Sequence, residues 1–320
     1  MAYTDSEDLN YRGELFNIGG DKTPFITMMG GLGAGQRRNS FLFPMAQPWA
    51  LGAASQPAIT ETVSATAGIP DTYTRSEDTN TVQIWQAYSE VTFMKQSQSG
   101  SMSGINTNDD NPVKDELTQQ QEGALKTLAK KMEYTFLNGS YQQATDSTTA
   151  AKTRGIVTAS AAGTNSVAAG GAALSKALID ELMLEMATNG AIFENMVVFV
   201  NGRQKQLISD IYGYPTPSRN VGGLNIMEVE TDFCKFGVVW DKQMETDDLL
   251  IAEMSVCQPV FVPVTFGANG PITNMTAGSE VLWVPTAITA ASFGGFFYAQ
   301  AGIDYGPEEY HGTITGLATG

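Results

Sequence analysis

The stretch from Asn111 to Gly139, NPVKDELTQQQEGALKTLAKKMEYTFLNG, predicts one long helix and thereby limits the folds open to this chain. Asn111 is a suitable N-cap, and Pro112 fits the first helical position because an N–H is not needed there. The Asn138-Gly139 pair ends the helix. Its apolar residues recur at three-, four- and seven-residue steps and form one stripe: Leu117, Ala124, Leu125, Leu128, Met132 and Phe136. At about 1.5 Å per residue the helix is roughly 40 Å long, enough to span a subunit.

The residues before this helix predict extended structure with little core of its own. Residues 1 to 40 mix apolar side chains with repeated glycines and keep no helical or strand period, which indicates an arm lying along something else. Residues 41 to 110 form a β-excursion, with Gly68 and Pro70 at its tip and the strand-like NTVQIWQAYSEVTFMKQ on its return. Ordering each backbone residue costs about 1–2 kcal/mol, so we expect neighbouring molecules to bury the excursion. The alternative is an ordinary antiparallel sheet packed on the same chain.

The second half of the chain predicts a compact region of mixed helices and strands. A low-complexity stretch rich in Ala, Ser, Thr and Gly is interrupted by RGIVT, which we interpret as a short strand or turn. LSKALIDELMLEMATNG predicts a helix ended by Asn189-Gly190, NMVVFV a buried strand, and Asn201 the cap of a short helix. IMEVETDF and KFGVVWD predict a strand pair, followed by the apolar DDLLIAEM and further strands towards the C-terminus. The fold class is α+β.

Charge is scarce in this chain and strongly acidic in balance. Charged residues make up 16% of the sequence, below the roughly 25% usual for globular proteins, which favours large surfaces that meet other protein. A surface rich in Ser, Thr, Gln and Asn is the alternative. The net charge of −16 argues against a nucleic-acid grip, because phosphate binding needs clustered Lys and Arg. An acidic face would instead repel DNA.

No motif predicts a catalytic residue, a cofactor site or a metal site. Cys234 and Cys257 lack the spacing of zinc or redox motifs, and GGLGAGQ lacks the preceding strand and the lysine of a phosphate-binding loop. His311 is the only histidine, and its strand-like surroundings favour a structural role. Paired acids such as Glu308-Glu309 fit turns and caps. The N-terminus lacks the features of a signal peptide, and no apolar run is long enough to span a membrane.

The order of these predicted elements resembles the Hong Kong 97 fold of tailed-bacteriophage major capsid proteins, in the short-chain subgroup without a fused scaffolding segment. Several words of the sequence carry the resemblance: DKTPF (21–25), NTVQIW (80–85), the helix from Lys114 to Gly139, RGI (154–156), VETDFCKFGVVWDKQMETDDLLIAEM (229–254) and DYGPEEYHGTITGL (304–317). Each word alone is loose, but together they touch nearly every region.

The resemblance implies a division of the chain into five parts. They are an N-terminal arm at 1–40, an extended E-loop at 41–111, a peripheral (P) domain with a long spine helix at 112–160, an axial (A) domain at 161–258, and C-terminal strands at 259–320 that return to both domains. In that family the arm and the E-loop reach across adjacent subunits. The excursion before the spine helix would then be stabilised by neighbours.

The function implied is structural: a major capsid protein whose copies form hexamers and pentamers that close into an icosahedral head around double-stranded DNA, bound without sequence specificity. The resemblance implies no enzyme activity and no cofactor. Its expected partners are further copies of itself, a separate scaffolding protein, a portal and a decoration protein, with no membrane. It would be located in the virion and assembled in the host cytoplasm. We predict the following inter-subunit contacts from position: Pro24, Phe25, Arg75, Glu77, Asp78, Glu116, Lys126, Tyr214, Pro215, Pro217 and Arg219.

Two departures and three alternatives accompany the resemblance. Some relatives cross-link subunits through a Lys and an Asn, but Lys95 is the only lysine between residues 40 and 110, so we expect non-covalent shells. Because the chain begins at Met1, we also expect no proteolytic removal of an N-terminal scaffolding region. The nearest alternative is an encapsulin-type nanocompartment shell protein. An acidic β-rich hydrolase and a surface adhesin are the others, the last opposed by the missing export signal.

Overall fold

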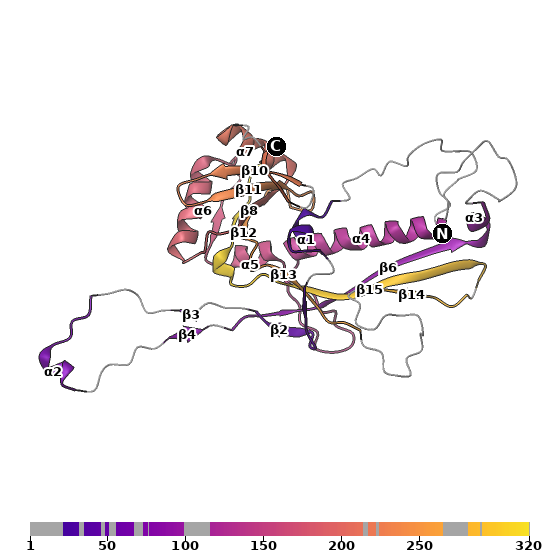
Figure 1. Ribbon diagram of the computed structural model, residues 1–320, viewed down its shortest axis with the longest axis horizontal. Helices are drawn as coiled ribbons and strands as arrows, with labels where there is room; N and C mark the ends of the chain where they lie inside the picture. Colours follow the sequence, from indigo (N-terminus) through magenta and orange to yellow (C-terminus); the bar gives the residue numbers. More distant parts are fainter. Residues whose placement is uncertain are drawn as a thin grey trace.

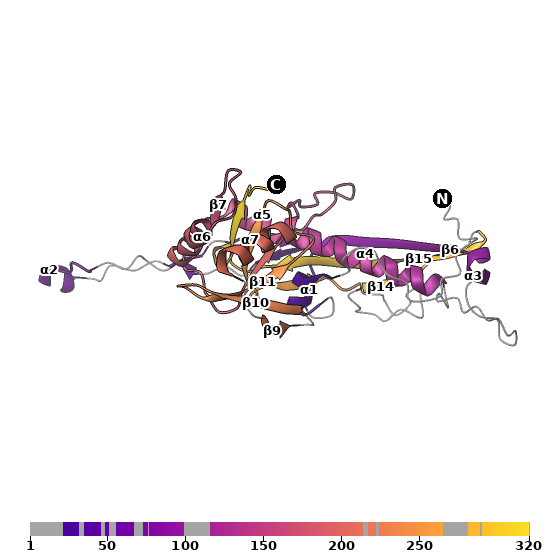
Figure 2. The same ribbon diagram turned by 90° about the horizontal axis from the view of Figure 1, so that it is seen from above.

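A computed structural model describes the fold in three parts (Figures 1 and 2). An elongated body consists of a long helix along a sheet, a compact lobe sits at one end of it, and a thin ribbon extends away beyond the lobe. The structure describes residues 22–31, 35–45, 49–50, 56–66, 73–75, 77–98, 116–213, 217–221, 224–264, 281–288 and 290–319.

The elongated body is built on helix α4 (Glu116–Asn138), which lies along strands β6 (Gln83–Thr92) and β15 (Ser292–Asp304) (Figure 1). The end of α4 at Asn138 confirms the prediction, whereas its predicted start at 111–115 lies outside the described residues. Its stripe buries Leu128, Met132 and Phe136, but Leu125 is exposed. The apolar contact therefore comes from the C-terminal half of the helix.

Strand β6 alternates between a buried and an exposed face, as expected for a strand covered on one side. Trp85 lies on the covered side, where its ring meets Phe136 of α4 edge-on at 6.2 Å, and its indole N–H donates to the Ala301 carbonyl at 3.0 Å. Along its whole length β6 pairs antiparallel with β15. The return of the predicted excursion thus belongs to a sheet of its own chain.

The body sheet is completed on the other side of β15. Strand β14 (Val281–Pro285) pairs with its first half and β13 (Gln258–Phe261) with its second half, and β1 (Gln36–Arg37) pairs parallel with β13. Beside it, β2 (Leu42–Pro44) pairs with β5 (Thr79–Thr81). The predicted strand through FMKQ is wrong at its end, because α3 (Phe93–Gln98) begins there. The Thr92 hydroxyl accepts from the Lys95 N–H at 3.4 Å and so caps this helix.

The compact lobe holds a seven-stranded sheet in the order β7-β16-β12-β8-β11-β10-β9. Its strands are β7 (Ser166–Ala168), β8 (Met196–Val200), β9 (Pro217–Val221), β10 (Leu224–Glu230), β11 (Lys235–Trp240), β12 (Leu249–Glu253) and β16 (Gly312–Thr315). Its helices are α5 (Ile156–Ala162), α6 (Lys176–Thr188) and α7 (Gly202–Tyr212). The predicted strand pair is the β10–β11 hairpin, and Ser175 and Asn201 cap α6 and α7. The predicted α+β class is confirmed.

The two faces of the lobe sheet belong to different cores. Phe199 and Leu250 face the main core, which also contains the buried residues of α4, β6 and β15. Val198 and Ile251, one position along each strand, face a second core with Leu182 of α6. Both β8 and β12 are buried at every position, and all their residues except Glu253 are apolar, as expected for central strands covered on both faces.

The prediction of a strand or turn for RGIVT is wrong, since helix α5 begins at Ile156. The Gly155 N–H donates to the Gly139 carbonyl at 2.8 Å, which places the start of α5 against the end of α4. Ile156 and Val157 are buried at this contact. Tertiary packing here overrides the strand preference of the β-branched residues.

The ribbon consists of the described residues 49–50, 56–66 and 73–75. Strand β3 (Trp49–Ala50) pairs antiparallel with β4 (Thr74–Arg75), and the short helix α2 (Glu61–Ser64) stands at its far end (Figure 1). α2 buries no residue, and Ile59 and Val63 are 66% and 40% exposed. Among the described residues, these apolar side chains therefore stand largely exposed at the far end of the ribbon.

Candidate functional site

The described residues contain no group of three or more His, Cys, Asp or Glu side chains placed to hold a metal ion. Among the same residues no helix is long and apolar enough to cross a membrane. The thiol of Cys257 is buried, which raises its pKa far above the usual range and leaves it protonated. The polar groups described below, His311 and the cluster around Arg154, connect one part of the fold to another.

His311 joins the end of the body sheet to the lobe. Its ring is fully buried, its Nε2–H donates to the Tyr305 carbonyl at 2.6 Å, and its Nδ1 accepts from the Glu253 N–H at 3.2 Å. An acceptor at Nδ1 requires the neutral imidazole. Burial lowers the pKa of His311 to about 4, which agrees with the structural role predicted for it.

Acid should weaken the subunit through His311. Because its pKa is lower in the folded chain than the ordinary 6.5, the folded state resists a proton that the unfolded state accepts. Stability is fully present above pH 6.5 and is lost as the pH falls towards 4, by about 3 kcal/mol. We expect His311→Gln to flatten this dependence. Urea midpoints of the unassembled subunit between pH 8 and 4 measure it, and equal slopes for both proteins would contradict the assignment.

A polar cluster fixes the root of the ribbon to the body. The Arg154 guanidinium donates from Nε to the Tyr305 hydroxyl at 2.5 Å and from Nη2 to the Asp78 carboxylate. The Asn80 amide N–H₂ donates to the Ile303 carbonyl at 2.9 Å, and its oxygen accepts from the Arg154 N–H at 2.9 Å. The chain is therefore anchored where it returns from the ribbon.

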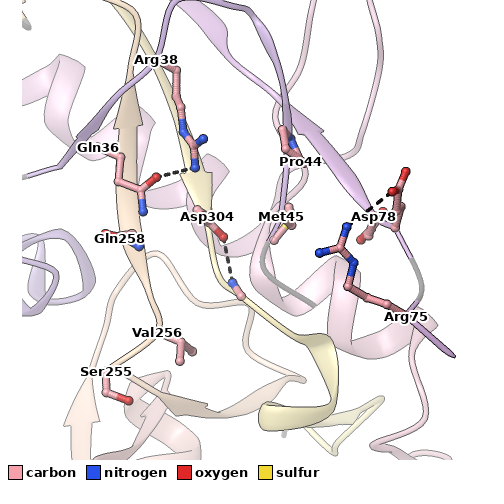
Figure 3. Close-up of a pocket in the computed structure, with 12 residues that line it drawn as sticks. Gln36, Arg38, Pro44, Met45, Arg75, Asp78, Ser255, Val256, Gln258 and Asp304 are labelled. Atoms are coloured by element: carbon pink, nitrogen blue, oxygen red, sulfur yellow. Dashed lines mark hydrogen bonds and ion pairs between the residues drawn. The ribbon is translucent and has the colours of Figure 1, made fainter. Parts of the chain in front are cut away.

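A cavity of about 840 Å³ opens beside this root, between the ribbon and the end of the body sheet (Figure 3). Arg38 and Asp304 line one side, where Arg38 donates to the Gln36 amide oxygen at 2.5 Å and Asp304 accepts from the Gly306 N–H at 3.0 Å. Arg75 and Asp78 line the other side (Figure 3). Asp78 belongs both to the cavity wall and to the Arg154 cluster, so the cavity adjoins the anchor of the ribbon root.

The structure distributes the predicted contact residues over separate places. Pro24 and Phe25 are buried inside their own chain, where Phe25 meets Phe199 edge-on at 5.2 Å; their contact with a neighbouring subunit stays a prediction. The Asp78 carboxylate pairs with the Arg154 guanidinium, and Glu77 Oε1 lies 3.6 Å from Arg75 Nη2.

The remaining contact predictions lie on α4 and on the lobe. Glu116 lies 3.9 Å from Lys95 near the end of α4 far from the lobe, and Lys126 is exposed on the same helix. Pro217 and Arg219 belong to β9, the edge strand of the lobe sheet, and nothing further is described of their side chains. Tyr214 and Pro215 lie outside the described residues.

An apolar surface that the sequence reasoning missed lies on the body sheet. Ile84 and Tyr88 of β6 are 53% and 55% exposed on the side away from α4. Phe296 and Tyr298 of β15 share this side, because they pair with Tyr88 and Gln86. We call these four residues the outer sheet face. In the sequence, apolar residues at both the odd and the even positions of β6 indicated that each side of this strand carries apolar side chains.

Comparison with known proteins gives one family and several related structures. The model of a family described as SU10 major capsid protein matches residues 2–318. The capsid asymmetric unit of cyanophage A-1(L) has a similar structure, with a TM-score of 0.67 at 13% identity over 98% of this chain and 97% of that one. The capsid of a native GTA particle gives 0.58 at 11% identity over 99% and 98% of the two chains. A structure from Mycobacterium phage Patience gives a TM-score of 0.54 at 9% identity over 93% of this chain and 84% of that one. No curated protein matches at a significant level.

Proposed function

Because the chain belongs to the SU10 major capsid protein family, we propose that its copies form the hexamers and pentamers of an icosahedral head that encloses double-stranded DNA. The protein is a major capsid protein of a tailed phage with the Hong Kong 97 fold, and that family is structural. The family assignment favours this function over the encapsulin and hydrolase alternatives.

The observation that carries the proposal is the ribbon. Its far end presents Ile59 and Val63 without cover, which a soluble monomer has no reason to maintain on a thin extension. On the outer sheet face Ile84 and Tyr88 are likewise exposed, beside the half-buried Phe296 and Tyr298. We infer that the ribbon of one subunit lies on the outer sheet face of a neighbour, since each surface supplies the apolar area that the other lacks.

We propose the following correspondence between the parts of the fold and the regions of a capsid subunit. The ribbon is the E-loop, the elongated body is the P domain with α4 as its spine, and the compact lobe is the A domain that meets its copies around the capsomer axis. We propose that the E-loop is narrower than 41–111, because β6 pairs with β15 of its own chain. Repeated contacts of one kind close into rings, and we propose that the cavity beside the ribbon root leaves room for the ribbon angle to differ between pentamers and hexamers.

The charge of the subunit fits a shell that holds DNA without binding it. A net charge of −16 disfavours tight phosphate contact, so packaged DNA can slide along the inner surface. We further propose a separate scaffolding protein, a portal and a decoration protein as partners, and assembly in the host cytoplasm before the capsid becomes part of the virion.

Imaging of particles tests this function directly. We expect the chain, expressed with the scaffolding protein of its phage, to form closed icosahedral shells visible by negative-stain electron microscopy. Boiling such shells in SDS should return monomers, because the contacts are non-covalent. A chain that stays monomeric at high concentration with the scaffold present would contradict the proposed assembly. Ladders of cross-linked subunits after boiling would contradict the expectation that the contacts are non-covalent.

A further inference from the structure

The first turn of the short helix α1 (Pro24–Met28) is hydrogen-bonded to a side chain of α4. Glu133 of α4 is fully buried, and its two carboxyl oxygens accept from the Phe25 N–H at 2.7 Å and the Ile26 N–H at 2.8 Å. The N-cap residue of α1, Thr23, makes no side-chain cap bond. Glu133 therefore supplies the acceptors that the first turn of this helix needs.

A second buried carboxyl group stands beside the first. Asp241 follows β11, is fully buried, and accepts from the Gln243 N–H at 2.8 Å through Oδ1. Its Oδ2 has no hydrogen-bond donor among the described residues. The two carboxyl groups are close enough to hydrogen-bond to each other, which they do only when one of them carries a proton. A proton on Glu133 would supply the donor that Oδ2 lacks.

The surroundings of the pair provide no compensating positive side chain in the described part of the chain. Helix α1 contributes its two N–H groups and no charged residue in its first or last turn. Met132 and Phe136 on α4 are apolar and buried, and Lys242 and Glu245 on the turn after Asp241 are exposed. Burial, followed by repulsion from Asp241, raises the pKa of Glu133 to about 9, and burial raises the pKa of Asp241 as well.

We propose that Glu133 and Asp241 hold one proton between them and form a latch that keeps α1 seated where α4 meets the compact lobe. The latch joins three elements, because Phe25 of α1 also packs on Phe199 of β8. When the proton leaves, two adjacent buried carboxylates repel each other, and separation of α1 and α4 lets water reach them. The position of the N-terminal segment is thereby linked to pH, independently of assembly.

The direction of the linkage follows from the pKa of Glu133. The closed latch keeps its proton up to about pH 9, whereas an open, hydrated glutamate loses it near 4.5. Between these values opening releases one proton. The opening equilibrium should therefore rise about tenfold for each pH unit in this window and level off above pH 9.

Hydrogen exchange of the subunit between pH 6 and 10, corrected for the intrinsic rate, tests the latch. We expect the Phe25 and Ile26 amides to lose protection about tenfold per pH unit up to pH 9. We expect Asp241→Asn to reduce this slope between pH 6 and 9, because the repulsion from Asp241 is lost and its amide donates to Glu133 at every pH, whereas the burial of Glu133 remains. The amides of Leu250 and Ile251 in β12 report global unfolding and should stay more protected. Equal slopes in both proteins, or equal protection of α1 and β12, would overturn the proposal.

Infrared spectroscopy detects the proton itself and covers the case in which Asp241→Asn does not fold. At pH 7 the wild-type subunit should show the carbonyl band of a protonated carboxyl group, and this band should disappear above pH 9. Glu133→Gln should lack the band at pH 7. A wild-type spectrum without such a band, or a band that Glu133→Gln leaves unchanged, would show that the pair holds no proton.

Discussion

A Gly155→Ala subunit is expected to lose about 3 kcal/mol of its free energy of unfolding, the upper part of the range for overpacked sites. A Cβ atom at this position would lie 2.4 Å from the Leu137 carbonyl oxygen and 2.5 Å from the Gly139 backbone nitrogen. Both are backbone atoms at the end of α4 and cannot turn away as a side chain would. Relief of the clash requires breaking the Gly155 N–H bond to Gly139, which separates α5 from α4.

The matched control for this change is Gly123→Ala on the exposed side of α4. A Cβ atom there meets nothing within 4 Å, and alanine is the better helix former, so we expect stabilisation by about 0.5–1 kcal/mol. Denaturation of the unassembled subunits in urea measures both changes. If Gly155→Ala unfolds at the wild-type midpoint, the close crossing of α4 and α5 is not as described.

The double substitution Ile59→Asp with Val63→Asp is expected to abolish shells while leaving the subunit folded. Both side chains are exposed in the subunit, so its free energy of unfolding should change by less than about 0.5 kcal/mol. In a shell, each carboxylate would be pressed against an apolar surface at a cost of several kcal/mol. Since about 1.4 kcal/mol is a tenfold change in an equilibrium constant, the yield of particles should fall at least a hundredfold.

A conservative pair of changes separates the effect of charge from that of any mutation at the tip. Ile59→Leu with Val63→Ile keeps the apolar area and should assemble at nearly the wild-type yield. Sedimentation of assembly mixtures, followed by urea denaturation of the soluble fraction, distinguishes failed assembly from failed folding. Wild-type yields of particles from the doubly charged protein would show that the ribbon tip does not lie in an interface.

Elements with signals inside their own sequence were predictable. Helix α6 carries its cap and its apolar spacing within one segment, and the fully apolar run of β8 marks a central strand. Helix α1 escaped prediction because the acceptor of its first turn is Glu133, 108 positions away. Helix α5 was missed for a related reason, since the contact of Gly155 with α4 decides its conformation.

The candidate site was only partly predictable, because a surface requires knowing which residues share a side. The extended excursion was predicted, and its outermost part is indeed uncovered. The prediction did not separate it from β6, whose ten-residue pairing with β15 depends on residues far along the chain. The individual contact residues chosen from position included Phe25, which is part of the core. The low content of charged residues indicated that the chain contacts other protein. Which side chains are exposed for such contacts depends on the folded structure, because the core buries the others.

The place of β16 in the lobe sheet determines when, during synthesis, a subunit can finish folding and join a shell. This strand lies between β7 and β12, so the sheet stays open until residues 312–315 have left the ribosome. Synthesis at about 5–20 residues per second delivers this strand after the other six strands of the sheet. A nascent chain that has not reached β16 therefore cannot finish the lobe, and growing shells receive only molecules in which this strand has been made.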